Sequence, residues 1–331
     1  MPKQRFITLV ILAALFMAAS AETPENKLIR LRNAIASTEK TADKAALLRE
    51  VGSVNNFQAM AYSAQFLNEK GLERVAAENV VSIATNHLEY NGKNTREWVR
   101  AAMPRVKGDI KKRGEAFLLL MPEKEEGFVS LFNGVDLTGW KGLVENPIKR
   151  SKMSADELAA AQVKADEQMR ADWQVENRLL AYVGTGYDNI CTEGQYKDFE
   201  MIVDWKLDPN GKEPDAGIYL RGTPQVQIWD IARVNVGAQV GSGGLYNNQK
   251  NRSTPLCVAD NKLGEWNTFY IRMVGDRVTV ILNGVKVVDD VVLENYWDRS
   301  QPIFPIEQIE LQAHGSKVYY RDIYVKKLQI N

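Results

Sequence analysis

Cysteine and histidine are scarce in this sequence. It has two of each among 331 residues, and its charges balance at 42 basic against 42 acidic side chains. So few Cys and His residues exclude a zinc site built from closely spaced thiolate and imidazole ligands. The charge balance excludes a global field that would draw nucleic acid to the protein, so we expect no nucleic-acid partner. A divalent cation held by carboxylates and carbonyls stays open, and no other cofactor is indicated.

A long apolar run occurs only at the N-terminus. Lys3 and Arg5 precede this run and the small residues Ala19-Ser20-Ala21 end it, which is the order of a secretory signal peptide at residues 1–21. A membrane anchor is the competing interpretation, but the run is short and no basic stop-transfer cluster follows it. We therefore expect export across the inner membrane to the periplasm, with no membrane insertion after cleavage.

Residues 22–114 have helical periodicity. Apolar residues recur at three- and four-residue spacing in five stretches, and turn residues such as Asn55-Asn56, Gly71 and Asn91-Gly92 separate them. This pattern predicts a small all-α, repeat-like domain. The charged segment 115–126 is expected to be a linker. The sequence leaves open whether the helical domain is a lid or a docking surface for a protein partner.

From Gly127 to residue 331 the period changes from helical to two, which indicates an antiparallel sandwich or barrel. Asn283-Gly284 between two alternating runs is a strong hairpin signal. A helix that starts at Ser154 interrupts the strands. Cys191 and Cys257 lie in apolar strand-like stretches, where a disulfide and two buried thiols are both possible. The predicted strands are 128–132, 179–183, 199–207, 217–221, 226–229, 268–274, 278–282, 286–288, 306–312 and 318–329.

Ordered motifs in this half of the chain resemble the 3-keto-disaccharide hydrolase family. The resemblance covers roughly residues 127–331 and does not extend to the helical domain. The motifs are Leu131-Phe132-Asn133-Gly134, Asp215-Ala216-Gly217-Ile218-Tyr219-Leu220-Arg221, Gln225-Val226-Gln227-Ile228-Trp229-Asp230 and Leu311-Gln312-Ala313-His314-Gly315.

The resemblance implies a mainly β fold, a concanavalin-like jelly-roll sandwich with a ligand groove on its concave face. It also implies action on glycosides oxidised at C3, which are split by elimination and then hydrated. The chain would then be a carbohydrate-active lyase or hydrolase whose substrate is an oligosaccharide or glycoside. Two rivals stay open, namely a hydrolase of unmodified glycan and a non-catalytic carbohydrate-binding module.

One strand argues against ordinary glycoside hydrolysis. Glycosidases of this architecture present the pattern E-x-D-x-x-E, and this chain has Gln225, Gln227 and Asp230 at that spacing. A retaining hydrolase needs two carboxylates, and this strand keeps one. For a hydrolase, Glu200, Asp204 or Glu310 would have to supply the second from another strand.

Elimination needs a single base, a donor for the enolate oxygen and help for the departing oxygen. We predict His314 as the acid/base, because its ordinary pKa lies near neutrality. Asp230 is the alternative base or the group that orients it, and Arg221 would stabilise the enolate. Each of these three residues has a structural alternative. We predict sugar contacts from Tyr219, Gln225, Gln227, Trp229, Tyr246, Asn247 and Gln312.

Overall fold

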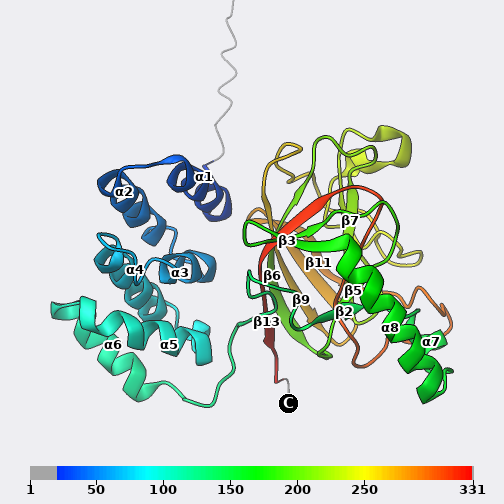
Figure 1. The fold of residues 1–331 in the computed structure, drawn as a ribbon, viewed down its shortest axis with the longest axis horizontal. Helices are drawn as coiled ribbons and strands as arrows, with labels where there is room; N and C mark the ends of the chain where they lie inside the picture. The colour runs from blue at the N-terminus through cyan, green and yellow to red at the C-terminus, as the bar shows by residue number, and fades with distance from the viewer. Residues whose placement is uncertain (1–20, 330–331) are drawn as a thin grey trace, which may run out of the picture.

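The computed structural model describes residues 21–329, so the predicted signal peptide lies almost wholly outside the described part of the chain. The N-terminal part of the structure is helical and the C-terminal part is mostly β (Figure 1). Its helices are α1 (Pro24–Ser37), α2 (Thr41–Gly52), α3 (Phe57–Ala64), α4 (Glu73–Asn86), α5 (Lys93–Ala102) and α6 (Gly108–Leu120), with short 3-10 turns at Leu88–Tyr90 and Met103–Arg105.

Helix α6 is longer than the sequence indicated. The predicted boundary at Gly114 is wrong, because the helix continues to Leu120 and only the segment after it is a linker. Gly114 is there for packing: a Cβ at this position would lie 2.6 Å from the Met103 sulfur and 3.0 Å from Val81. A glycine that looked like a breaker therefore permits a close helix–helix approach.

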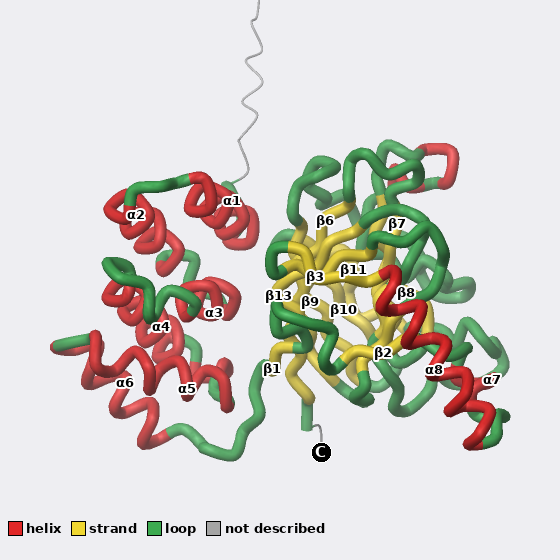
Figure 2. Tube along the Cα trace, in the orientation of Figure 1, coloured by secondary structure: helices red, strands yellow, loops and turns green. Residues whose placement is uncertain are grey.

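Two antiparallel sheets form the C-terminal part (Figure 2). The larger sheet has the order β11-β10-β9-β6-β13-β4-β3, with β1 paired to β13, and the smaller has the order β2-β5-β12-β7-β8. The strands are β1 (Val129–Ser130), β2 (Trp140–Gly142), β3 (Trp173–Glu176), β4 (Leu179–Tyr182), β5 (Ile190–Thr192), β6 (Phe199–Leu207), β7 (Asp215–Leu220), β8 (Thr223–Trp229), β9 (Asn267–Val274), β10 (Arg277–Leu282), β11 (Val285–Val292), β12 (Glu310–Leu311) and β13 (Val318–Lys327).

The predicted fold class is confirmed: the chain is a mainly β sandwich preceded by a helical region. The predicted hairpin is present, since Leu282 pairs with Val285 around Asn283-Gly284, where both turn residues have positive φ. Helix α8 (Ala155–Asp172) begins with a capping box at Ser154 and Glu157 and follows the short helix α7 (Pro147–Arg150). Strands β2, β3 and β5 were not predicted from the sequence.

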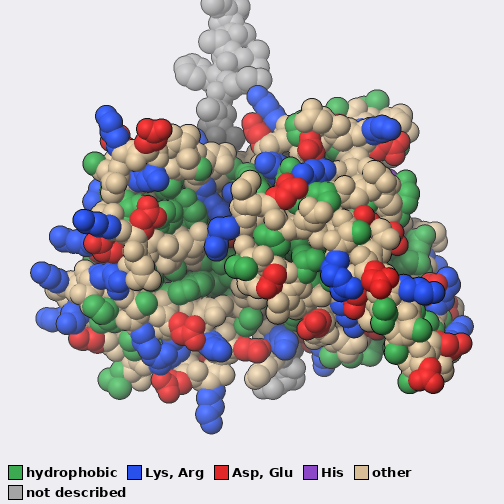
Figure 3. Space-filling view, in the orientation of Figure 1, with side chains coloured by type: hydrophobic (Ala, Val, Ile, Leu, Met, Phe, Trp, Pro, Cys, Tyr) green, Lys and Arg blue, Asp and Glu red, His purple; other side chains and the backbone are tan. Residues whose placement is uncertain are grey.

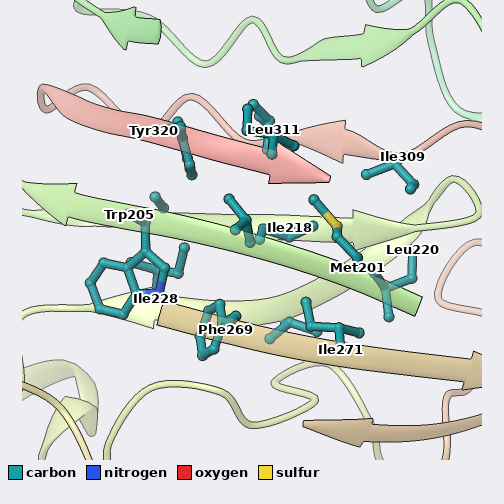
Figure 4. Close-up of a cluster of buried hydrophobic side chains, with 14 of the residues drawn as sticks. Met201, Trp205, Ile218, Leu220, Ile228, Phe269, Ile271, Ile309, Leu311 and Tyr320 are labelled. Carbon is teal, nitrogen blue, oxygen red and sulfur yellow. The ribbon is translucent and has the colours of Figure 1, made fainter. Parts of the chain in front are cut away.

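Side chains from both sheets fill the sandwich core (Figure 4). Met201 and Phe269 face inward from the large sheet, while Ile218, Ile228 and Leu311 face inward from the small one. All five are fully buried. Because strand side chains alternate, the residues between them point outward, and on the small sheet these outward residues are polar.

The helical domain packs on the outer face of the large sheet. Phe57 meets Tyr324 edge to face at 5.1 Å, and Tyr324 and Ile202 belong to the helical core cluster. In Figure 3 hydrophobic atoms gather where the two parts meet, while charges of both signs are spread over the rest of the visible face. The small sheet's outer face lies on the far side of the sandwich, so the helices do not form a lid over it.

Asp204 is the polar centre of this interface. It lies on β6, is buried, and accepts hydrogen bonds from Gln58 of α3 (2.9 Å), Thr268 (2.6 Å) and Arg321 (2.9 Å). Arg32 of α1 lies 3.6 Å from the same carboxylate and also pairs with Asp322. A buried carboxylate is stable only when it is paired and hydrogen-bonded, so this network depends on both parts of the chain.

The cysteines are not paired: Cys191 is buried and Cys257 is exposed, and both are free. Among the described residues, none of the helices combines the length and the apolar character needed to cross a bilayer.

We predict that Asp204→Ala lowers the free energy of unfolding by about 3–5 kcal/mol, because it leaves buried arginines without their partner. Arg74→Ala, which removes the exposed Arg74–Glu78 pair, is the control and should cost less than about 1 kcal/mol. Urea denaturation of both variants measures the difference. Equal losses would show that Asp204 does not hold the two parts together.

Candidate functional site

A pocket of about 450 Å³ lies on the outer face of the small sheet. Strands β7 and β8, the segment after β12 and three loops form its walls. All seven residues predicted to contact sugar line it, together with the predicted base; they are Tyr219, Gln225, Gln227, Trp229, Tyr246, Asn247, Gln312 and His314.

Strand register brings these distant residues together. Glu310 of β12 lies opposite Tyr219 of β7, and Gly217 of β7 lies opposite Gln227 of β8. Beyond the end of β12 the ladder continues, because the Gln312 N–H donates to the Gly217 carbonyl at 2.9 Å. Period-two alternation then places the side chains of residues 310, 312 and 314 on the outer face.

Gly217 forms part of the pocket floor. A Cβ at this position would lie 2.9 Å from Gln312 Oε1 and 3.0 Å from Gln225 Cδ. The absence of a side chain therefore lets two glutamines from different strands approach each other across β7. This requirement is steric, because Gly217 is not among the positive-φ glycines.

A chain of hydrogen bonds crosses the floor. The Gln225 amide donates to Gln227 Oε1, and Gln227 Nε2 donates to Asp215 Oδ1 at 2.7 Å. Arg233 donates to the other oxygen of Asp215 at 3.3 Å. Burial raises the pKa of Asp215, and the nearby charge of His314, the Gln227 hydrogen bond and Arg233 oppose that rise. The carboxylate thus lies between the Gln227 amide and the Arg233 guanidinium, with His314 nearby.

His314 has an unused nitrogen. Its Nδ1 is buried and has no hydrogen-bond partner, and Tyr187 packs edge-on against the ring at 5.2 Å. Gln312 Oε1, two residues earlier on the same face, is also buried and unpartnered. Buried polar atoms are nearly always satisfied, so two such atoms in one pocket indicate groups that meet a ligand or ordered water.

The glycine-rich segment after β8 forms one rim. Gly243 N–H donates to the Gln227 carbonyl at 2.8 Å, and Gln227 N–H donates to Gly244 at 3.0 Å, so the segment extends the sheet edge. This pairing places Tyr246 and Asn247 on the pocket. Tyr246 meets Trp229 edge to face at 5.1 Å, and together they supply an aromatic wall of the kind that binds sugar rings.

Two predicted catalytic residues do not reach the pocket. Arg221 follows the last residue of β7 in a left-handed conformation, with φ of 49°, which turns its side chain away from the face of Tyr219. Its guanidinium donates instead to the carbonyls of Pro305 and Gly275. The expectation that Arg221 stabilises an enolate is therefore wrong. Arg221 is a buried residue of the hairpin, and its side chain bonds to backbone carbonyls.

Asp230 also lies elsewhere. It would need a bulge in β8 to turn into the groove, and none of the register shifts in the β7–β8 pairing lies near it. It lines a separate small hollow with Trp205 and Asp260, where its carboxylate accepts from the Ala232 N–H at 3.0 Å. The expectation that Asp230 serves as the base or orients it is corrected on this ground.

Sequence reasoning missed Asp215 and Arg233, which line the pocket with Glu213, Tyr296 and Trp297. The surrounding Pro-Asp-Ala-Gly has the composition of a turn, which hides the position of Asp215 at the start of β7. Alternation could have found it, since positions 215, 217 and 219 share a face of β7. Nothing local in the sequence marks Arg233, which reaches Asp215 from a loop after β8. Across residues 21–329 no cluster of three His, Cys, Asp or Glu side chains suited to a metal is found.

The family model of the 3-keto-alpha-glucoside-1,2-lyase-like domain matches residues 127–326. The chain belongs to this family. The match confirms the resemblance found in the sequence motifs, and it makes the chain a member of a carbohydrate-active, lyase- or hydrolase-like family. The matched region starts at the linker and contains every residue of the pocket.

Solved structures also resemble this family member. A Parabacteroides distasonis protein provisionally described as a glycosyl hydrolase has 22% identity and a TM-score of 0.43, over 61% of this chain and 95% of that one. The carbohydrate binding module CBM66 from Bacillus subtilis has 10% identity and a TM-score of 0.32, over 57% of this chain and 96% of that one. No curated protein matches the chain.

We predict that Gly217→Ala disturbs the pocket of this 3-keto-alpha-glucoside-1,2-lyase-like domain, because the new methyl group collides with Gln312 and Gln225. Such overpacking costs about 1–3 kcal/mol of folding stability and displaces the glutamines. Thermal denaturation and sugar binding by calorimetry measure the two effects. Unchanged stability and binding would show that the glutamines do not meet over this glycine.

Proposed function

We propose that this protein cleaves the glycosidic bond of 3-keto-glycosides by removing the C2 proton and eliminating the O1 leaving group. The family match supports the substrate class. The observation that carries the mechanism is the pocket itself: an imidazole with an unpartnered nitrogen, in a hollow lined by amides and aromatic rings. Hydration of the resulting glycal is a second step that the same imidazole could assist.

The elimination needs only one base, because the C3 ketone makes the C2 proton acidic. When His314 takes the C2 proton, the electron pair moves onto the C3 oxygen as an enolate. The enolate then collapses to a C1–C2 double bond and the C1–O1 bond breaks. The leaving oxygen takes a proton, which His314 can return to it. Gln225, Gln227 and Gln312 would bind hydroxyl groups, and Trp229 with Tyr246 would hold a ring face.

Double displacement on an unmodified glycan is less well supported. It requires a free nucleophilic carboxylate about 5 Å from an acid/base carboxyl group. Glu213 and Asp215 both pair with Arg233, at 3.6 and 3.3 Å. Of the three candidates named from the sequence, Glu200 and Asp204 lie on the large sheet, away from this pocket, and Glu310 is buried on the small sheet and does not line it. The two glutamines at the glycosidase positions cannot act as nucleophiles.

We predict cleavage of a 3-keto-disaccharide and none of its unoxidised parent. His314→Gln should lower the rate by about 10²–10⁴-fold, because general base catalysis contributes that much. The matched control is Asp230→Asn, which lies outside the pocket and should retain activity. Chromatography of the released sugars measures cleavage by the native protein on both substrates and by the two variants, and sugar binding by His314→Gln confirms an intact pocket.

Three results would contradict the proposal. Cleavage of the parent disaccharide would favour a hydrolase, binding of sugar without turnover would favour a carbohydrate-binding module, and full activity of His314→Gln would remove the proposed base. The assay therefore tests both substrate class and mechanism.

We also propose that the protein acts outside the cytoplasm, in the periplasm, on the basis of the basic, apolar and small-residue segments of residues 1–21. Expression of the full chain in a bacterium should give a mature form that begins at Glu22, as found by N-terminal sequencing of the periplasmic fraction. An uncleaved chain in the cytoplasm would contradict this prediction.

A further inference from the structure

A buried carboxyl group lies next to the pocket and has no role in the steps described so far. Glu310 of β12 is only 1% exposed. It faces Tyr219 of β7 on one side and Cys191 of β5 on the other, so all three side chains share the outer face of the small sheet. Tyr219 lines the pocket and Glu310 does not, which places the carboxyl group behind the tyrosine.

Asn189 connects the two groups. Its Oδ1 accepts the Ala313 N–H at 3.0 Å, which fixes the amide so that its NH₂ group is the donor to other neighbours. That amide lies near the side chains of both Glu310 and Tyr219 and lowers the pKa of each. With the Asn189 amide as a donor beside it, Tyr219 can direct its own O–H hydrogen into the pocket that it lines.

The other oxygen of Glu310, Oε2, is buried and has no partner. No cation is paired with it: Arg150, the nearest basic group that acts on it, is bound to Glu307 at 3.1 Å and to Gln308 at 3.0 Å. An ionised carboxylate in such a position would be unpaired and desolvated, which proteins avoid. The geometry therefore favours the protonated acid.

We propose that Tyr219 donates the hydrogen bond that stabilises the enolate oxygen, and that neutral Glu310 is the positioning residue that supports this donor from behind. This inference rests on the proposed elimination reaction. It fills the role that Arg221 cannot take, since Arg221 points away from the pocket. The amides of Gln225 and Gln227 are poorer candidates because they already bond along the floor.

The electrostatics of the surroundings are consistent with a neutral Glu310. Burial raises its pKa to about 8, while Arg150 lowers the pKa and Glu307 raises it. The facing groups are also uncharged, since burial raises the pKa of the Cys191 thiol to about 12 and raises that of Tyr219 as well. Lys141 lies opposite Cys191 on β2 and is one strand further away.

The proton balance of the step is closed. Tyr219 keeps its proton and shares it with the developing O3 anion, so no net transfer to or from the tyrosine occurs. The C2 proton passes to His314 and then to the leaving oxygen. Glu310 also keeps its proton while it is neutral. Above pH 8 its ionisation would place a negative charge near the enolate, which opposes the formation of that second charge.

Two variants test the proposal on 3-keto-disaccharide cleavage. Tyr219→Phe should lower kcat by about 10²–10³-fold with a small change in KM, because a donor to the oxyanion acts mainly in the transition state. Tyr319→Phe, on the opposite sheet, is the matched control. We expect the activity of the native enzyme to decline above about pH 8, and Glu310→Gln, which keeps a neutral side chain of the same shape, should retain activity and lack this decline.

A second readout does not depend on turnover. Between the ordinary carboxyl pKa and about 8, the folded state binds the Glu310 proton and the unfolded state does not, so native stability falls as pH rises through this range. Glu310→Gln should lack this part of the pH dependence in urea denaturation.

The outcomes separate the two proposals. If the native protein does not cleave the 3-keto-disaccharide, the proposed function fails, and the stability measurement still decides whether Glu310 is neutral. If cleavage occurs and Tyr219→Phe is fully active while folded, or if Glu310→Gln has the native decline above pH 8, the inference about Tyr219 and Glu310 is overturned.

Discussion

The pairing of β12 with β7 is the constraint on which the pocket depends. Leu311 lies opposite Ile218 inside the core, which forces Glu310 and Gln312 to point outward beside Tyr219 and Gly217. A slip of one residue in this pairing would bury the polar side chains and expose the apolar one. The resulting loss of folding free energy would exceed what the hydrogen bonds of a two-residue strand contribute. The burial of one leucine thus fixes the direction of the polar side chains that line the pocket.

Much of the architecture was predictable because long strands carry a clear period. β6 was predicted at its true bounds, and the hairpin at Asn283-Gly284 followed from turn chemistry alone. Strands β2, β3 and β5 were missed because three or four residues contain too little alternation to be recognised. α6 was cut short because Gly114 serves packing rather than termination, and this difference is visible only when the neighbouring helix is in place.

The residues of the candidate site were also predicted unevenly. Gln225 and Gln227 lie on β8, and Gln312 and His314 follow β12 in extended backbone that still bonds to β7, so alternation predicted that all four line the pocket. Arg221 and Asp230 sit just past strand ends, where a single left-handed residue or a missing bulge changes the direction of the side chain. Arg233 comes from a loop, and no pattern in the sequence relates it to Asp215. Prediction therefore failed where the direction of a side chain depends on a local change in the backbone that the sequence pattern does not encode.

The packing of the helices on the large sheet has a consequence for how the chain can be divided. The family match begins at residue 127, which suggests a natural place to cut. A sandwich released there would present Ile202 and Tyr324 to water and leave Asp204 without Gln58 and Arg32. The boundary of the family in the sequence is thus not a boundary in packing, because the helices cover apolar side chains on the outer face of the large sheet.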